Sequence, residues 1–315
     1  MESIMKKSGI IFPGQGSQKV GMGKDLYDAD PSVKEMFDLA NKILGRDITS
    51  ICFEGPKETL TLTANAQPCI FLVSIILFER LKKILPTPTF LAGHSLGEIT
   101  AYVAAGAIDF ETALRVIDKR GRAMANAFPS EKSAMAAVIG KSPDEIRALI
   151  SEFAEAPVVA ANLNAPTQTV ISGEIEGVQA AIAKLKENGA KVIPLNVSGA
   201  FHSPLMGPAS DELSIFLQDI KFRNAQIPII LNRTATAETS ASELKENLPL
   251  QVISSVRWTE SIETMASSVD MIIECGPGRV LSGLAKKIDP SVSLLNISAL
   301  EDQETVENAL KEVVK

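Results

Sequence analysis

The chain has 315 residues and a formal net charge of −7 at neutral pH, with 45% hydrophobic and 22% charged residues. This composition is ordinary for a soluble globular protein, and the acidic balance argues against a nucleic-acid-binding protein, which usually presents a basic face. The three cysteines form no C-x-x-C pair, so we expect reduced cytosolic thiols in place of a disulfide framework or a zinc site.

The ends and the apolar runs of the sequence bear on location. Residues 1–8 are too few and too polar for a signal peptide. The longest apolar run, residues 68–78, is too short to cross a bilayer and is typical of a buried helix. We therefore expect a cytoplasmic protein that does not enter a membrane.

Apolar runs and helical periodicity predict alternating strands and helices in the first 128 residues. A strand over 9–12 ends at Pro13-Gly14, and a helix over 109–128 has Asp109 as its N-cap. The other elements predicted here are helices over 31–44, 67–85 and 96–105 and a strand over 89–92.

The middle of the chain predicts the order βαββαβ, which is the ferredoxin-like arrangement. Its predicted elements are strands over 134–139, 157–162, 169–172 and 191–195 and helices over 142–153 and 175–188. We interpret residues 129–198 as a small ferredoxin-like domain inserted into a larger α/β domain of residues 1–128 and 199–315. The elements predicted after it are a helix over 204–217, strands over 228–231 and 271–275, and a last helix from about residue 279.

The segment Gly93-His94-Ser95-Leu96-Gly97 fits the G-x-S-x-G pattern of a nucleophile elbow between a strand and a helix. Such a turn holds the serine in a strained, exposed position, and the glycines allow the tight turn and the approach of a substrate. The Leu96 N–H would begin the helix and can donate to an oxyanion. Five residues alone could match by chance, but the context favours Ser95 as a nucleophile.

Only two histidines, His94 and His202, are present to activate Ser95. His94 adjoins the serine in a tight turn, where neighbouring side chains usually point apart. His202 lies in a loop that leads into a predicted helix, and such loops commonly carry catalytic residues. We therefore predict His202 as the base; the alternative is an isolated surface or core histidine.

A third group should orient the imidazole of the base. Acids such as Asp144 and Glu174 lie between the serine and the histidine in the sequence, but they fall within the inserted domain. The sequence therefore offers no triad acid.

Arg120 lies in the middle of an apolar stripe on the helix predicted over 109–128. A buried guanidinium needs a partner, and its planar fork suits a carboxylate. Arg120 could therefore hold the free carboxylate of a dicarboxylic acyl group. The alternatives are an arginine that extends to the surface and an internal ion pair.

Three glycine-containing segments suggest ligand loops, but we assign none of them to a cofactor. Residues 14–19 resemble a dinucleotide loop, with Lys19 where the third glycine belongs, and residues 16–22 have Met22 where a P-loop requires lysine. Gly276-Pro277-Gly278 is more typical of a turn and helix entry than of an anion site.

Taken together, these residues resemble the malonyl-CoA:acyl carrier protein transacylase family over essentially the whole chain. The motifs that carry the resemblance are residues 12–18, Gln67-Pro68, residues 93–98, Arg120-Gly121, Phe201-His202 and Gly276-Pro277-Gly278.

The resemblance implies an α/β-hydrolase-like core with a ferredoxin-like insertion, and it implies catalytic roles. Ser95 would be the acylated nucleophile and His202 its base, while the backbone N–H groups of Gln15 and Leu96 would form the oxyanion hole. A backbone carbonyl, placed at Gln251, would orient the histidine in place of an acid.

The resemblance also implies that Arg120, Gln67 and Phe201 bind the substrate, with Arg120 holding the malonyl carboxylate. Phe201 before His202 looks like the malonyl-selective version of this loop. Many relatives have histidine where this chain has Gly199, so the preference for malonyl over methylmalonyl stays open.

The implied activity is transfer of a malonyl group from malonyl-CoA to the phosphopantetheine thiol of acyl carrier protein, for fatty acid biosynthesis. It needs no metal or redox cofactor, and we expect a monomer. A patch of Arg279, Lys286 and Lys287 is predicted to dock the acidic carrier. The alternatives are a serine thioesterase or hydrolase, a polyketide-pathway acyltransferase, and a non-catalytic carrier-binding module.

Overall fold

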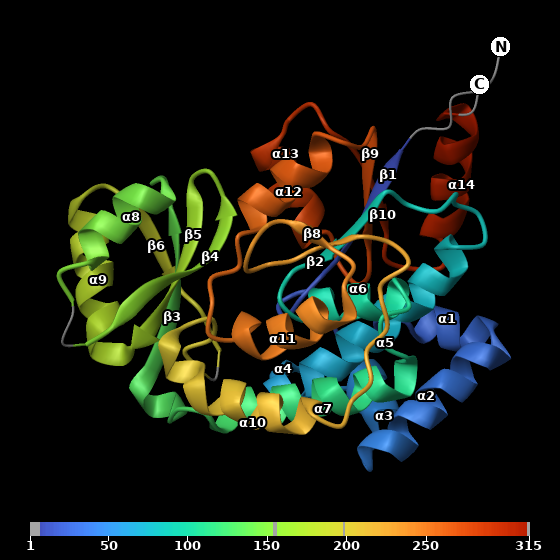
Figure 1. Ribbon diagram of the computed structural model, residues 1–315, viewed down its shortest axis with the longest axis horizontal. Helices are drawn as coiled ribbons and strands as arrows, with labels where there is room; N and C mark the ends of the chain where they lie inside the picture. The colour runs from blue at the N-terminus through green and yellow to red at the C-terminus, as the bar shows by residue number, and fades with distance from the viewer. Residues whose placement is uncertain (1–6, 154–155, 198, 314–315) are drawn as a thin grey trace.

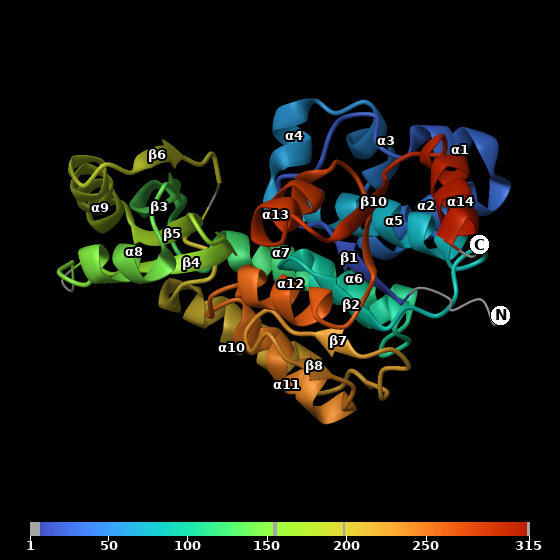
Figure 2. The same cartoon turned by 90° about the horizontal axis from the view of Figure 1, so that it is seen from above.

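The computed structural model of the chain describes residues 7–153, 156–197 and 199–313. A large unit is built on a six-stranded sheet and a small unit on a four-stranded sheet. In two perpendicular views the small unit lies beside the large one, at the end away from α1 (Lys24–Ala29) and α14 (Asp302–Val313) (Figure 1, Figure 2). The expectation about a signal peptide concerns residues that lie mostly outside the described range.

The large sheet has the strand order β10-β9-β1-β2-β7-β8, and its neighbouring strands are parallel except for β7 and β8. β1 lies inside the sheet and is buried along its whole length, as expected for a parallel strand covered on both faces. The strands of this sheet are β1 (Ser8–Phe12), β2 (Phe90–Gly93), β7 (Ile229–Ile230), β8 (Ala237–Glu238), β9 (Met271–Cys275) and β10 (Ser293–Ile297).

Helices cover both faces of this sheet. Besides α1 and α14, the large unit contains α2 (Pro31–Leu44), α3 (Ile48–Phe53), α4 (Lys57–Thr61), α5 (Thr63–Leu81), α6 (Leu96–Ala104), α7 (Phe110–Asn126), the 3-10 turn η2 (Pro204–Met206), α10 (Gly207–Leu217), α11 (Ala241–Gln251), α12 (Trp258–Ala266) and α13 (Val280–Ile288). Ile10 and Phe12 belong to the same core cluster as residues of α5, α6 and α7, whereas Ile11 belongs to a second cluster with residues of α12 and α13. The two clusters lie on opposite faces because successive side chains of a strand alternate.

The small unit is an antiparallel sheet with two helices packed on one face. Its elements are the 3-10 turn η1 (Ser130–Lys132), β3 (Ser133–Ile139), α8 (Pro143–Ile150), β4 (Val158–Ala165), β5 (Gln168–Glu174), α9 (Ile175–Glu187) and β6 (Lys191–Pro194). The strand order is β4-β5-β3-β6. After η1, the chain order β, α, β, β, α, β agrees with the order predicted from the sequence.

An edge of the small sheet is covered by the large unit. β4 lies at this edge, and the Val256 N–H donates to the Ala161 carbonyl at 2.8 Å, while the Leu163 N–H donates to the Val256 carbonyl at 2.9 Å. The segment between α11 and α12 therefore adds one residue of parallel pairing to the small sheet.

The predicted elements agree with the structure where the pattern was strong. The helix over 31–44 is α2 and ends before Gly45 at φ 64°, and the strand over 271–275 is β9. The helix predicted over 204–217 begins with the turn η2 before α10. The helix predicted to begin near residue 279 is α13, but the prediction that it is the last element is wrong, because β10 and α14 follow it. β10 is a sheet edge with only one fully buried residue, so its sequence has no long apolar run.

α5 begins four residues before its predicted start, although Pro68 lies inside it. Proline has no N–H to donate to the carbonyl of residue 64, and the guanidinium of Arg46 donates to the Ala64 carbonyl instead, at 2.6 Å. α5 is long and apolar enough to cross a membrane, but 78% of its apolar window is buried inside the fold. This burial confirms the prediction of a core helix.

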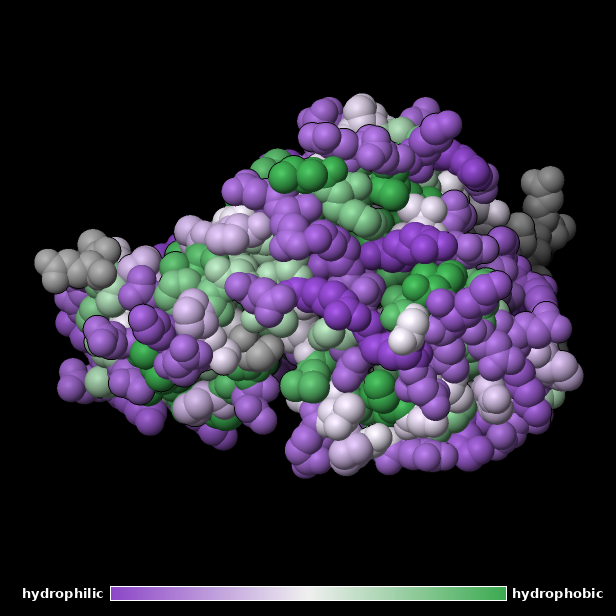
Figure 3. Space-filling model, turned by 90° about the horizontal axis from the view of Figure 1, so that it is seen from below, coloured by the Kyte–Doolittle hydropathy of each residue, from purple (hydrophilic) through white to green (hydrophobic). Residues whose placement is uncertain are grey.

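The surface mixes hydrophobic and hydrophilic residues (Figure 3), and the three cysteines lie inside the fold. On the face seen from below, hydrophobic residues reach the surface in separate groups between hydrophilic ones (Figure 3). Cys52, Cys69 and Cys275 are all free and buried.

Candidate active site

Ser95 lies in the sharp turn between β2 and α6, at the carboxyl edge of the large sheet. Its backbone has φ 53° and ψ −104°, a conformation that non-glycine residues rarely adopt. A side chain at Gly93 would come within 1.9 Å of the Gly97 backbone, and one at Gly97 within 2.0 Å of the Phe12 carbonyl. The two glycines of the pattern are therefore required by close backbone contacts.

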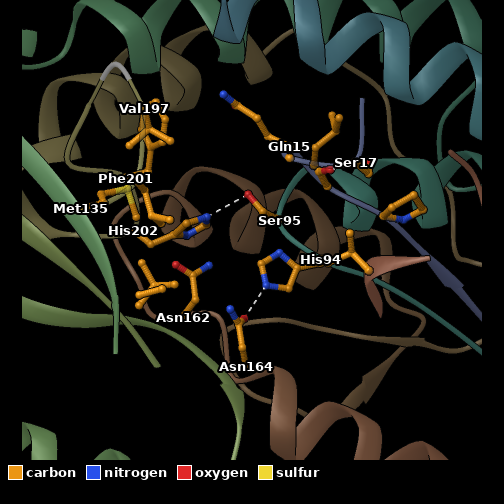
Figure 4. A pocket seen from close by; sticks show the side chains of 18 of the residues that line it. Gln15, Ser17, His94, Ser95, Met135, Asn162, Asn164, Val197, Phe201 and His202 are labelled. Atoms are coloured by element: carbon orange, nitrogen blue, oxygen red, sulfur yellow. Dashed lines mark hydrogen bonds between the residues drawn. The ribbon is translucent and has the colours of Figure 1, made fainter. Parts of the chain in front are cut away.

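His202 makes a hydrogen bond to the Ser95 hydroxyl, with 2.8 Å between Nε2 and Oγ (Figure 4). The other ring nitrogen, Nδ1, lies 3.0 Å from the Gln251 carbonyl and 3.1 Å from the Ser254 carbonyl. Two carbonyl oxygens can only accept, so Nδ1 carries the proton and Nε2 is free to accept from Ser95. The pair has the geometry of a nucleophile and its base.

Backbone carbonyls occupy the place of a triad acid. Among the described residues no carboxylate is hydrogen-bonded to His202, and Asp144 is an exposed residue of the small unit that pairs with Arg147. Glu174, the other acid considered from the sequence, is the last residue of β5 in the small unit and directly precedes α9. His94 does not contact the serine hydroxyl; its Nε2 lies 2.9 Å from Oδ1 of Asn164.

Arg120 is fully buried on α7 and lies beside the same serine hydroxyl. Its guanidinium donates to Ser95 Oγ at 3.0 Å, to Gln67 Oε1 at 2.9 Å and to Gln251 Oε1 at 2.8 Å. These acceptors are uncharged, and within the described ranges no ion pair of Arg120 is recorded. Burial lowers the pKa of Arg120 from its ordinary value to about 10, so the guanidinium stays cationic at neutral pH and can receive an anionic group.

Two backbone N–H groups at the edge of the elbow are free to donate. Gln15 follows β1 and Leu96 is the first residue of α6, and across the described parts of the chain neither N–H has a recorded acceptor. Gly14 brings the first loop against the elbow, since a side chain there would lie 2.3 Å from the His94 carbonyl. The arrangement can accept a developing oxyanion.

Ser95 and His202 face a pocket of about 390 Å³ between the two units. Gln15, Ser17, Asn162 and Asn164 supply polar side chains around it (Figure 4). The small unit contributes an apolar wall of Met135, Ala137, Val170, Leu195 and Val197, and α13 contributes Val280, Leu281 and Leu284. Phe201 lines the pocket beside His202, and a side chain at Gly199 would lie 2.7 Å from its ring.

Both histidines are held in the neutral form. Burial, followed by the positive charge of Arg120, lowers the pKa of His202 from 6.5 to about 3, and burial lowers the pKa of His94. A neutral imidazole at pH 7 is what a general base needs. Because the folded-state pKa lies below the unfolded value, the stability linked to His202 is complete above pH 6.5 and falls as the pH drops toward 3.

We expect that the His202 ring does not titrate between pH 8 and about pH 5.5. Two-dimensional ¹H–¹⁵N spectra of the labelled rings would show two sets of signals, and a His202→Asn variant assigns them. A His202 signal that moves with a midpoint near 6.5 would contradict the burial of this site.

Several residues that contact the site were missed in the sequence. Asn232 accepts from the Ser95 N–H, Ser254 shares the Nδ1 proton of His202, and Asn164 pairs with His94. Each is a small polar residue without a motif. The position of Asn232 just after a strand predicted to lie in the large sheet was the one available signal.

Known proteins resemble the chain in sequence and in structure. Residues 10–287 match the acyl transferase domain family. A malonyl CoA-acyl carrier protein transacylase of Bacillus subtilis strain 168 is 45% identical over 311 residues, which cover 98% of this chain and 97% of that protein.

Solved structures agree with this match. An acyl carrier protein S-malonyltransferase from Vibrio cholerae superposes with a TM-score of 0.92 at 39% identity, covering 95% of this chain and 99% of that one. A malonyl-transacylase in complex with its type II polyketide synthase acyl-carrier protein superposes with a TM-score of 0.93 at 37% identity, covering 96% and 99%.

Proposed function

The chain belongs to the acyl transferase domain family, and from this membership we propose that it transfers a malonyl group from malonyl-CoA to the phosphopantetheine thiol of an acyl carrier protein. One observation carries the proposal: a single hydroxyl, Ser95 Oγ, is bonded both to a neutral imidazole and to a buried guanidinium. The imidazole can take the proton of the serine hydroxyl during acyl transfer, and the guanidinium can bind an acyl group that ends in a carboxylate.

In the first step the Ser95 hydroxyl attacks the thioester carbonyl while its proton passes to His202 Nε2. The N–H groups of Gln15 and Leu96 receive the negative charge on the carbonyl oxygen. When the carbon–sulfur bond breaks, the imidazolium returns the proton to the departing thiolate, so that coenzyme A leaves as a thiol. A malonyl-serine ester remains. The Gln251 carbonyl stabilises the imidazolium during the step.

In the second step the carrier thiol gives its proton to His202 and attacks the ester, and Ser95 leaves as a hydroxyl. The reaction uses only the side chains and N–H groups of the chain itself, so we propose that no metal or redox cofactor takes part. The apolar wall of the pocket disfavours water, and this protects the ester until the thiol arrives.

Arg120, Gln67 and Phe201 are proposed as the residues that select the acyl group. The malonyl carboxylate would replace the Ser95 hydroxyl as the acceptor of Arg120, while Gln67 keeps the guanidinium in place. Phe201 is almost fully buried against the backbone of Gly199 and limits the space beside the acyl chain.

We further propose an α/β-hydrolase-like core of residues 1–128 and 199–315 with a ferredoxin-like insertion of residues 129–198. The antiparallel strand order of the small sheet and the two helices on one of its faces support this division. The boundary residue 198 lies outside the described residues. We also propose a cytoplasmic monomer, and the buried free thiols suit a reducing compartment.

The test is the intact mass of the protein after brief exposure to malonyl-CoA, with acetyl-CoA in parallel. We expect one malonyl adduct, located by peptide mapping on the peptide that contains Ser95, and its removal by phosphopantetheinylated carrier protein. Release of free malonate without an adduct would indicate a hydrolase. If a polyketide carrier protein removes the malonyl group as efficiently as a fatty acid carrier protein does, this result would place the enzyme in the polyketide pathway.

The carrier is expected to dock on α13, where Arg279, Lys286 and Lys287 are exposed beside the pocket residues Val280 and Leu284. Reversing the charge of both lysines should raise the KM for the carrier about tenfold and leave acylation by malonyl-CoA within about twofold. The matched control reverses Lys34 and Lys42, which are exposed on α2 away from the pocket. Equal effects of the two pairs would remove α13 as the docking site.

A further inference from the structure

A buried carboxylate lies behind the nucleophile, and the proposed steps do not use it. Glu98 is in the first turn of α6, three residues after Ser95, and is fully buried. Its Oε1 accepts from the Tyr102 hydroxyl at 3.0 Å and from Asn247 Nδ2 at 2.8 Å. Its Oε2 accepts from the backbone N–H of Asn232 at 2.5 Å. A carboxylate without water around it remains in a fold only where such donors hold it.

Asn232 connects this carboxylate to the elbow. It is fully buried in the turn after β7, the strand next to β2. Its side chain donates to the Gly93 carbonyl at 2.6 Å and accepts from the Ser95 N–H at 2.7 Å. The Asn232 amide thus bonds to Gly93 and to Ser95, on either side of His94, and holds both ends of the turn in place as a clamp.

The Ser95 backbone needs such a clamp. Its φ of 53° and ψ of −104° lie in a region that persists only where the surroundings over-determine it. The opposite side of the residue is also held, because Gln251 Nε2 donates to the Ser95 carbonyl at 3.0 Å. The position of the hydroxyl between His202 and Arg120 follows from these two sets of bonds.

We propose that Glu98 and Asn232 are positioning residues of acyl transfer: Glu98 orients Asn232, and Asn232 holds the strained elbow so that the Ser95 hydroxyl meets His202 and the Leu96 N–H. Neither residue touches the pocket or the acyl group. The inference rests on the proposed function, because it assigns a purpose to the strain at the nucleophile of that reaction.

The geometry predicts a loss in rate without a loss in substrate binding. Asn232 has no recorded bond to Arg120 or Gln67, so the carboxylate site stays intact when Asn232 changes. A misplacement of a reacting atom by about 1 Å can lower a rate about 10²-fold. We expect Asn232→Ala to lower kcat by about 10²-fold and Glu98→Gln by roughly tenfold or more, with the KM for malonyl-CoA changed less than about threefold.

The matched control is Tyr102→Phe, which removes a hydroxyl from the other oxygen of Glu98 and leaves every bond of Asn232 in place. All variants are compared per active site, from the amount of malonyl incorporated at saturation. A merely structural role would lower that amount and leave the rate of each remaining site unchanged.

A fluorophosphonate that reacts with activated serines separates this inference from the proposed function. A wild-type protein that reacts with the fluorophosphonate but not with malonyl-CoA would overturn the function and still allow the test of the clamp. Slower labelling of both clamp variants, with Tyr102→Phe at the wild-type rate, supports the inference. A rate per site within about twofold of wild type in Asn232→Ala, or an equal loss in Tyr102→Phe, overturns it. If Asn232→Ala does not fold, Glu98→Gln decides by the same criterion.

Discussion

Replacing Ser95 with alanine is expected to reduce malonyl transfer to the uncatalysed background, and replacing His202 with alanine to lower it on the order of 10³-fold or more. The Ser95 hydroxyl is the atom that would carry the malonyl group, and His202 Nε2 at 2.8 Å is positioned to take its proton. Because both residues act on the same proton transfer, the double variant should be no slower than Ser95→Ala alone. Rapid-quench measurement of radiolabelled malonyl incorporation gives these rates directly.

Circular dichroism and the thermal midpoint provide the control for folding in these variants. The His202→Ala protein should keep its binding of malonyl-CoA, since the guanidinium of Arg120 has no recorded bond to His202. A His202→Ala rate within about tenfold of wild type would show that another group takes the proton.

Replacing Arg120 with alanine is expected to lower kcat/KM for malonyl-CoA roughly 10²-fold and to leave acetyl-CoA turnover within about threefold. The loss corresponds to about 3 kcal/mol, the typical effect of removing one partner of a buried charge pair. An acetyl group has no carboxylate and therefore forms no such pair. Steady-state kinetics with both thioesters measure the ratio of kcat/KM for malonyl-CoA to kcat/KM for acetyl-CoA. This ratio should move toward one in the variant.

Arg122→Ala is the matched control, since Arg122 lies on the same helix but is exposed and pairs with Asp118. It should leave both substrates unaffected. Arg120→Ala also leaves Gln67 Oε1 and Gln251 Oε1 without a donor, so a lower thermal midpoint is expected and must be measured beside the kinetics. An equal loss on malonyl and acetyl thioesters would exclude Arg120 as a carboxylate site.

The sequence predicted the parts of the site that depend on short patterns. The elbow at Ser95 is visible because glycines on both sides of the serine follow a short apolar strand, and the structure shows close backbone contacts at both glycines. Arg120 is visible because a single charge interrupts the apolar stripe of a long helix, and its complete burial excludes the alternative of an arginine that extends to the surface. His202 was found because only two histidines were available.

Contacts between segments far apart in the chain could not be predicted in this way. Asn232 meets the elbow only because β7 lies beside β2, and a short polar turn gives no sign of that pairing. The carbonyl at Gln251 was expected from the resemblance, whereas the carbonyl of Ser254 and the bonds from the Gln251 side chain to Arg120 and Ser95 were not. Backbone groups and amides carry no pattern, so only the folded arrangement reveals them.

The pairing of β4 with Val256 has a consequence for the order in which a growing chain becomes active. All strands of the small sheet are complete once residue 194 has been synthesised, but the Leu163 N–H and the Ala161 carbonyl must wait for Val256, 62 residues later. Until then β4 is an uncovered edge, open to pairing with other chains. The segment that covers it also brings the Gln251 and Ser254 carbonyls to His202. Protection of the β4 edge and the orientation of the His202 ring are therefore both acquired late in synthesis, when the same segment is added.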